Sequence, residues 1–354
     1  MPVLYCYCGE SRRCDVSFFL REISAKNNCT VPCTEIDLCR GGEAHNLADK
    51  IFLDTLIARI TNLEFNFVIC TPPCNTHSRA TYANKFGPAP LRSEDFPLGL
   101  PHLKGKLAEK VEVANSLIHG AILICLTAHT AKVPFMLEHP EDLGATQNGI
   151  PASIWNLPSL RELAAVSGAN TFAFFQCRAC MPNSSAATPD YPKPTRFITT
   201  AFFPGSFIYH GWPVKDDLGW YSGPLPRWCG HRHYTKLTVN KRPSGDEKFK
   251  SAAAAAYPPA MCEWIAGAVF AAAKNCIQSR VTSPAVGQGQ EKSKLSSRDS
   301  LDMADWETSS EDEDGDRKPV LGEGHELCAI PRSYKYQSRI EVRPYRIGFY
   351  LARL

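Results

Sequence analysis

Short apolar segments alternate with longer segments of helical periodicity through the first half of the chain. The apolar segments span residues 3–8, 30–38, 65–70, 133–137 and 171–176. Apolar residues at helical spacing predict helices between them, most clearly over 47–60 and 104–132. Strands that are apolar throughout are typical of a parallel sheet covered on both faces. We therefore predict an α/β fold with a Rossmann-like, mostly parallel sheet.

The carboxyl-terminal half is less regular. We expect helices over 154–166 and over the Ala-rich residues 251–276, the latter interrupted at Tyr257-Pro258-Pro259, and a strand over 195–203. Residues 81–103 and 204–250 are expected to form loops, the second of them aromatic and basic. After residue 277 the composition changes to Ser, Gln, Lys and acidic residues, which predicts disorder.

The net charge of +3 conceals a segregation of charge. Residues 299–316 contain nine acidic and no basic side chains, so the rest of the chain carries +12. A basic body favours an anionic partner.

Fifteen cysteines, six of them in the first 39 residues, are many for one chain. The first residues lack the basic and apolar regions of a signal peptide, and we expect no membrane-spanning segment. We therefore expect an intracellular protein with reduced thiols, nuclear if its source is eukaryotic, in which most cysteines are small core residues.

Polar residues follow the predicted strands at five places. Ligands of open parallel sheets bind beyond the carboxyl ends of the strands. The five segments are Gly9-Glu10-Ser11, Glu35-Ile36-Asp37, Pro72-Pro73-Cys74-Asn75, Glu138-His139-Pro140 and Gln176-Cys177-Arg178. Cys74 follows two prolines that restrict the backbone, so its thiol is a candidate nucleophile, and the alternative is a buried structural cysteine.

The sequence TPPCNTHSRA, residues 71–80, resembles the catalytic loop of DNA cytosine-5 methyltransferases, which contains Pro-Cys-Gln followed by Phe-Ser. Glu138 resembles the glutamate of the family's Glu-Asn-Val motif, and Gln176-Cys177-Arg178 resembles the start of its Gln-x-Arg-x-Arg strand. Residues 256–259, AYPP, with the helix after them, resemble its carboxyl-terminal motif. The motifs also follow one another in the same order.

A divergent group of methyltransferase-like proteins from phages and mobile elements is more similar. It shares the loop of residues 87–101, the Lys193-Pro194-Thr195 motif and a Cys-Gly-x-x-His-like motif. The resemblance covers residues 1–275 and implies a methyltransferase-like domain over 1–276, with a substrate-recognition region over about 180–250. A disordered acidic linker over 277–330 and a basic tail over 331–354, to which we assign no role, would follow.

The resemblance implies transfer of a methyl group from S-adenosylmethionine to C5 of a cytosine in DNA, with RNA left open as the substrate. The implied catalytic residues are Cys74, Glu138 and Arg178. The implied cofactor-binding residues are Tyr7, Gly9, Ser11, Asp37, Asp49 and Pro72. The expected substrate-binding residues are Asn75, Ser78, Arg79, Arg92, Gln176, Lys193, His231 and His233. Arg79 and Arg92 are basic residues near the Cys74 loop that could contact phosphate, and the alternative is that both are solvated.

Two alternatives follow from departures from the family pattern. The family's first motif has several glycines, whereas residues 7–12 contain only Gly9. A degenerate, mobile-element-derived domain that binds nucleic acid without turnover is therefore one alternative. The other is methylation of an exocyclic amine of a nucleobase, for which Cys74 would not be needed.

We predict no metal site. Cys177, Cys180, Cys229 and His233 would supply four ligands, but their spacing is not that of a standard zinc finger. The basic and aromatic residues over 227–242 suit phosphate contact and base stacking, and the alternative is a solvated basic face.

Overall fold

The computed structural model describes residues 1–82, 87–179, 191–233 and 254–282. The chain divides into two units, residues 1–287 and 288–354, and all described residues belong to the first. The predicted acidic linker from residue 283 onward and the basic tail therefore lie outside the described residues.

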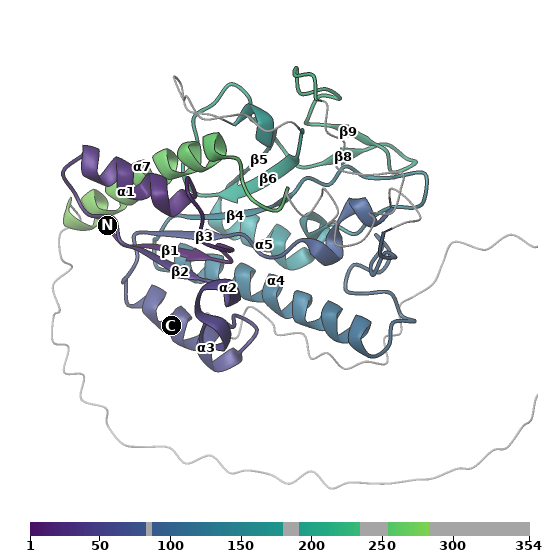
Figure 1. The fold of residues 1–354 in the computed structure, drawn as a ribbon, viewed down its shortest axis with the longest axis horizontal. Coiled ribbons are helices and arrows are strands. Elements are labelled where there is room, and N and C mark those ends of the chain that lie inside the picture. The colour runs from purple at the N-terminus through teal and green to yellow at the C-terminus, as the bar shows by residue number, and fades with distance from the viewer. Residues whose placement is uncertain (83–86, 180–190, 234–253, 283–354) are drawn as a thin grey trace, which may run out of the picture. The chain divides into compact units, whose positions relative to one another are not determined.

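A seven-stranded mixed sheet forms the centre of the first unit (Figure 1). Its strands, in spatial order, are β2 (Cys33–Ile36), β1 (Val3–Cys6), β3 (Phe67–Cys70), β4 (Phe135–Pro140), β6 (Pro194–Thr199), β5 (Asn170–Phe175) and β7 (Tyr209–His210). The first four are parallel, β6 runs antiparallel to both of its neighbours, and β7 runs antiparallel to β5. The predicted α/β class with a mostly parallel sheet is confirmed, and the arrangement is compatible with a Rossmann-like fold.

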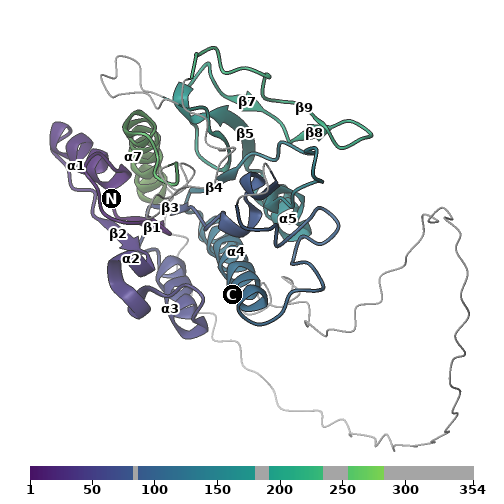
Figure 2. The ribbon, with the colours of Figure 1, turned by 45° about the vertical axis from the view of Figure 1, so that its right-hand side comes forward.

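Helices cover both faces of the sheet (Figure 2). Helices α1 (Val16–Lys26) and α7 (Pro259–Thr282) pack together over one face. Helices α3 (Lys50–Thr61), α4 (Lys106–Thr130) and α5 (Pro158–Ser167) form a contiguous layer, and α4 contacts β3 and β4. The short helix α2 (Leu38–Gly41) follows β2.

Aspartate caps set where two of these helices begin. Asp15 accepts a hydrogen bond from the backbone of Phe18 at the start of α1, and Asp49 accepts one from Phe52 at the start of α3. Such caps satisfy amide groups that the first turn leaves unpaired. This is why α3 begins at Lys50 although the apolar periodicity extends back to residue 47.

Trp264 of α7 anchors this helix to the sheet. Its fully buried ring lies within 5.0–6.5 Å, centroid to centroid, of five phenylalanine rings. Aromatic packing of this kind adds to the free energy of burial. The anchor places the start of α7, and Tyr257 just before it, near the carboxyl end of β4.

Three departures from the predicted elements concern the carboxyl-terminal half. The residues before Tyr257 that the structure describes form a turn, and the helix begins at Pro259 and extends to Thr282, past the expected boundary at 276. Proline suits a first helical position because no hydrogen bond is lost there. In the expected loop, β8 (Val214–Lys215) pairs with β9 (Tyr221–Gly223), and β7 joins the main sheet.

Helix α4 is long and apolar enough, by length and composition, to cross a membrane. However, 61% of its most apolar window is buried inside the fold. Its contacts with α3, α5, β3 and β4 are typical of a core helix.

Candidate functional site

Cys74 lies beyond the carboxyl end of β3, as predicted. The segment after the strand is fixed to the end of β1, because the Thr71 hydroxyl donates a 2.8 Å hydrogen bond to the carbonyl of Tyr7. Two prolines follow, and Cys74 then precedes a 3₁₀ turn over Asn75–His77. Its side chain is half-buried. The sequence therefore holds this thiol on a short and rigid loop.

Glu138 lies on β4, the strand next to β3, and is buried. Its Oε2 accepts a 2.6 Å hydrogen bond from the hydroxyl of Tyr257. Its Oε1 is buried and has no hydrogen-bond partner among the described residues. Burial raises the pKa of the Glu138 carboxyl, although Lys193 and the Tyr257 hydroxyl favour its ionised form. Unpartnered buried acceptors are rare and indicate either bound water or a ligand position.

Lys193 brings a positive charge close to Cys74 and Glu138. Its Nζ donates a 2.7 Å hydrogen bond to the carbonyl of Ala254 and lies 6.0 Å from the centre of the Tyr257 ring. Its charge favours the thiolate of Cys74, while burial is the larger effect and raises the pKa of that thiol. Glu138 raises the same pKa further. Cys74, Glu138 and Lys193 therefore form one electrostatically coupled group, which we call the Cys74 cluster.

Gln176 and Arg178, both predicted from one motif, diverge after β5. Gln176 is fully buried, donates a 2.9 Å hydrogen bond to Thr195, and its Oε1 lacks a partner among the described residues. Arg178 is exposed and donates to the carbonyl of Cys229 at 3.4 Å. The cation whose charge acts on Cys74 is Lys193, which was expected only to bind substrate, rather than Arg178.

The residues expected to bind the cofactor are partly brought together. Gly9, just beyond β1, donates its backbone NH to Asp37 at 2.9 Å, and Asp37 also caps α2 through Cys39. Gly9 has φ +71°, and a Cβ added there would meet nothing within 4 Å. Open space therefore adjoins the Gly9 backbone, beside the carboxylate of Asp37.

The other expected cofactor residues have different surroundings. Tyr7 donates its hydroxyl to the carbonyl of Leu117 at 2.8 Å, and Pro72 is buried next to the Cys74 loop. Ser11 is exposed, and the carboxylate of Asp49 is used to cap α3. Helix capping gives Asp49 a structural reason to be present, independent of any ligand.

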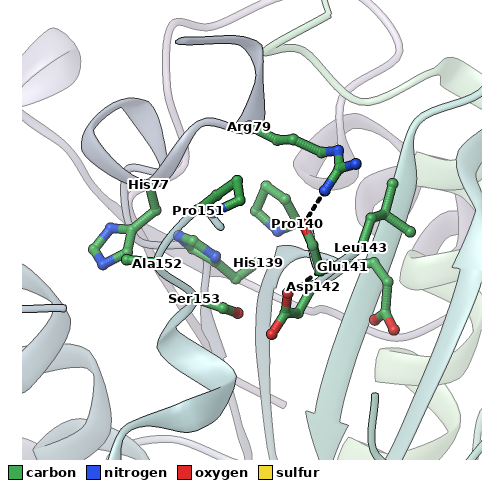
Figure 3. Close-up of a pocket in the computed structure, with 11 residues that line it drawn as sticks. His77, Arg79, His139, Pro140, Glu141, Asp142, Leu143, Pro151, Ala152 and Ser153 are labelled. Carbon is green, nitrogen blue, oxygen red and sulfur yellow. Dashed lines mark hydrogen bonds between the residues drawn. The ribbon is translucent and has the colours of Figure 1, made fainter. Parts of the chain in front are cut away.

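A small pocket adjoins the end of β4 (Figure 3). Its polar and charged side chains are those of His77, Arg79, His139, Glu141, Asp142 and Ser153. The two histidine rings meet edge to face with centroids 5.6 Å apart. Burial lowers the pKa of His77 to about 2 and that of His139 to about 3, so both rings are neutral. Nε2 of His139 is buried and has no partner among the described residues. Neither Cys74 nor Glu138 lines this pocket.

Two arginines expected to contact phosphate have structural partners instead. Arg92 is 1% exposed, and its guanidinium donates to Thr76, Asn115 and the carbonyls of Pro97 and Val111. Arg79 donates to the carbonyls of Gly144 and Ala145. These contacts fix the loops around the site, and they correct the interpretation of Arg92 as a phosphate ligand. Asn75 is exposed, and the Ser78 hydroxyl accepts a hydrogen bond from its own turn.

His231 and His233, also expected to bind substrate, lie close to two cysteines, Cys177 and Cys229. Ligand atoms of Cys177, Cys229, His231 and His233 all lie within 4.8 Å of one another. Cys180, which the sequence suggested as a ligand, lies outside the described residues.

Two residues of the site were not assigned a role from the sequence. Tyr257 belongs to the AYPP motif, and its place next to two prolines that start a helix could have identified it. His139 was noted only as a replacement for asparagine. We found no match to this chain among protein-family models, curated proteins or solved structures. The functional interpretation therefore depends on the residues themselves.

Proposed function

We propose that this protein transfers a methyl group from S-adenosylmethionine to C5 of a cytosine in DNA, through a covalent adduct of Cys74. The observation that carries the proposal is the Cys74 cluster, in which a thiol after β3, a buried carboxyl on the adjacent β4 and a lysine just before the antiparallel β6 lie toward the same edge of the sheet. The basic body of the chain favours a polyanionic substrate.

Each member of the Cys74 cluster has a distinct task in this chemistry. The thiol of Cys74 loses its proton to solvent, which the charge of Lys193 favours, and its sulfur then forms a bond to C6 of a cytosine flipped out of the duplex. The buried carboxyl of Glu138 holds a proton for N3, which balances the charge that develops on the ring. C5 then takes the methyl group and S-adenosylhomocysteine is released. Loss of the C5 proton to solvent, return of the N3 proton to Glu138 and cleavage of the C6–S bond restore the ring and free the thiolate of Cys74.

Tyr257 and Gln176 complete this arrangement. Tyr257 fixes one oxygen of Glu138, which leaves Oε1 for the base. Gln176 follows β5 at the same edge of the sheet, and its buried Oε1 has no partner among the described residues. This acceptor suits an exocyclic amine of the base. Buried hydrogen-bonding groups that only the correct ligand satisfies are an effective source of specificity.

The residues near β1 fit S-adenosylmethionine, whose role is to supply the methyl group. The space above Gly9 permits close approach of a ligand to the backbone, and Asp37 at the end of β2 can accept hydrogen bonds from ribose hydroxyls.

The decisive experiment uses DNA of random sequence that contains 5-fluorodeoxycytidine, together with S-adenosylmethionine labelled in the methyl group. Fluorine at C5 cannot leave as a proton does, so the adduct persists under denaturing conditions. We expect a labelled protein–DNA band from the full chain, its absence with Cys74→Ser, and its retention with Cys39→Ser, since Cys39 is exposed and outside the cluster.

Other results would select the alternatives. Labelled DNA without an adduct, in amounts unchanged by Cys74→Ser, would indicate methylation of an exocyclic amine. DNA binding without detectable binding of S-adenosylmethionine, measured by calorimetry, would indicate a nucleic-acid-binding domain without catalysis.

A further inference from the structure

The geometry points to a structural zinc site formed by Cys177, Cys229, His231 and His233. This site does not depend on the proposed methyl transfer. Two cysteine sulfurs and two imidazole nitrogens lie within 4.8 Å of one another. In a tetrahedral zinc site, Zn–S distances near 2.3 Å and Zn–N distances near 2.0 Å separate the ligand atoms by about 3.3–3.8 Å. The four side chains therefore need to close by about 1.5 Å at most.

Two parts of the chain, distant in sequence, supply the ligands. Cys177 lies in the 3₁₀ turn that follows β5. The other three alternate along the loop after β9, at positions 229, 231 and 233. Sγ of Cys229 already lies 3.0 Å from Nε2 of His233, and the rings of His231 and His233 are 5.9 Å apart.

The backbone around the ligands is arranged for such a site. The backbone NH of His231 points to the sulfur of Cys229 at 3.5 Å, and the Trp228 indole donates to the carbonyl of His231 at 2.9 Å. Hydrogen bonds of this type orient metal ligands. Gly230 has φ +87°, and a Cβ there would lie 3.0 Å from Nη1 of Arg178, so glycine suits this tight turn between two ligands.

The ligand set selects zinc among the common ions. Thiolate and imidazole suit zinc, whereas calcium and magnesium require oxygen ligands. Four protein ligands would fill the tetrahedron and leave no position for a substrate, so the role of the ion would be structural.

The packing around the loop explains what the metal would contribute. Cys177 and Cys229 belong to a small apolar cluster with Ala173, Phe175 and Leu225, separate from the main core. Arg227, Trp228, Gly230 and Arg232 in the same loop are exposed. Few apolar contacts hold this segment, and zinc would join it to the end of β5. It would thereby fix the exposed basic and aromatic side chains beside Arg178.

The test is metal analysis of the full chain, expressed with zinc and purified without chelators. We expect one zinc per chain by mass spectrometry, and a cobalt-substituted sample with the intense visible absorption of tetrahedral thiolate–imidazole coordination. Cys229→Ser and His233→Asn should each lose the metal, whereas the matched variants Cys39→Ser and His102→Asn, at exposed positions, should keep it.

A second measurement keeps the test decisive if a variant fails to fold. X-ray absorption of the zinc-loaded wild-type chain should give two sulfur and two nitrogen neighbours at about 2.3 and 2.0 Å. Zinc retained by the folded double variant Cys229→Ser/His233→Asn would overturn the proposal. A zinc-free protein would overturn it too, as would a Cys177–Cys229 disulfide found by non-reducing peptide mapping.

Discussion

The hydroxyl of Tyr257 donates a 2.6 Å hydrogen bond to Oε2 of Glu138, and thereby joins two residues that are 119 positions apart in the sequence. The bond connects the turn before α7 to β4. Because Trp264 anchors α7 in the core, the packing of one helix holds a hydrogen-bond donor against a carboxyl of the candidate site, and this bond favours the ionised form of Glu138 against the effect of burial.

Tyr257→Phe removes this bond and leaves the carboxyl with less support for its charged form. Burial already places the pKa of Glu138 above its ordinary value, so the folded protein holds the proton more tightly and loses stability as pH rises through that raised pKa. We expect the substitution to cost about 1–3 kcal/mol of unfolding free energy, more at pH 8 than at pH 4.5. Urea unfolding at the two pH values measures it.

Tyr209→Phe is the matched control, because Tyr209 packs at the small cluster beside β5 and not at Glu138. In the background of Glu138→Gln, Tyr257→Phe should have the same cost at both pH values. An equal cost at both values in the wild-type background would contradict the expected link to Glu138.

The charge of Lys193 should control the reactivity of Cys74. Removing it with Lys193→Met raises the thiol pKa further, since this charge is the principal effect that opposes burial. Alkylation of Cys74 by iodoacetamide at pH 8, followed by peptide mass spectrometry, should then slow, while the rate at exposed Cys39 should be the same in both proteins. Arg178→Met should leave the rate at Cys74 unchanged; a similar slowing by both variants would show that Lys193 has no special position.

Two neutral histidines should make the fold sensitive to acid. Because the pKa values of His77 and His139 in the folded state are about 2 and about 3, the stability they contribute is complete above their unfolded value near 6.5 and is lost as pH falls below it. Below this value, each histidine should lower the free energy of unfolding by about 1.4 kcal/mol per pH unit. His139→Asn should reduce this slope by about one proton in urea unfolding between pH 7 and 5.

His102→Asn, at an exposed position, serves as the reference. If it changes the slope as much as His139→Asn does, burial of His139 is not the cause of the acid sensitivity.

Arg196 and Glu141 form a fully buried ion pair with nitrogen–oxygen distances of 2.6 and 2.9 Å, and Tyr221 adds a hydrogen bond to the carboxylate. Removing one partner strands a buried charge, so Glu141→Gln or Arg196→Met should each cost about 3–5 kcal/mol. The double variant should cost less than the sum. By comparison, breaking the half-exposed Arg59–Glu64 pair should cost about 1 kcal/mol or less. Additive costs at the buried pair, measured by urea unfolding, would refute this coupling.

Arg92 should affect stability and not DNA binding. Arg92→Met leaves several buried acceptors unpaired and should cost about 3 kcal/mol, measured by urea unfolding. Arg227 is exposed, so Arg227→Ala should leave stability unchanged and reduce the slope of log affinity against log salt by about 1, if this face contacts phosphate. Weaker DNA binding by a fully stable Arg92→Met variant would restore the phosphate role.

The sequence alone predicted most of the strands and helices, and it failed for β7, β8 and β9, which lie in a segment expected to form a loop. Apolar periodicity and capping residues act locally, so β1, β3, β4 and β5 were predicted close to their observed positions. Cys74 follows its strand as expected, whereas β4 continues to Pro140, so Glu138 lies on this strand rather than after it. A mostly parallel sheet was also predicted, because apolar strands need cover on both faces, but the order of the strands was not.

Tertiary structure decided which side chains of these ends meet. Lys193 reaches Cys74 and Glu138 because β6 pairs antiparallel with β4, and Tyr257 reaches Glu138 because α7 packs on the sheet. Local periodicity predicts neither the strand pairing nor the helix packing. Arg92 was a candidate for phosphate because it is basic and near the Cys74 loop. In the fold it is buried, and its guanidinium donates to four acceptors in the Cys74 loop, its own loop and α4. Cys177 meets Cys229, His231 and His233 only because β5 and the loop after β9 converge, and ligand spacing along the chain cannot report a convergence in space.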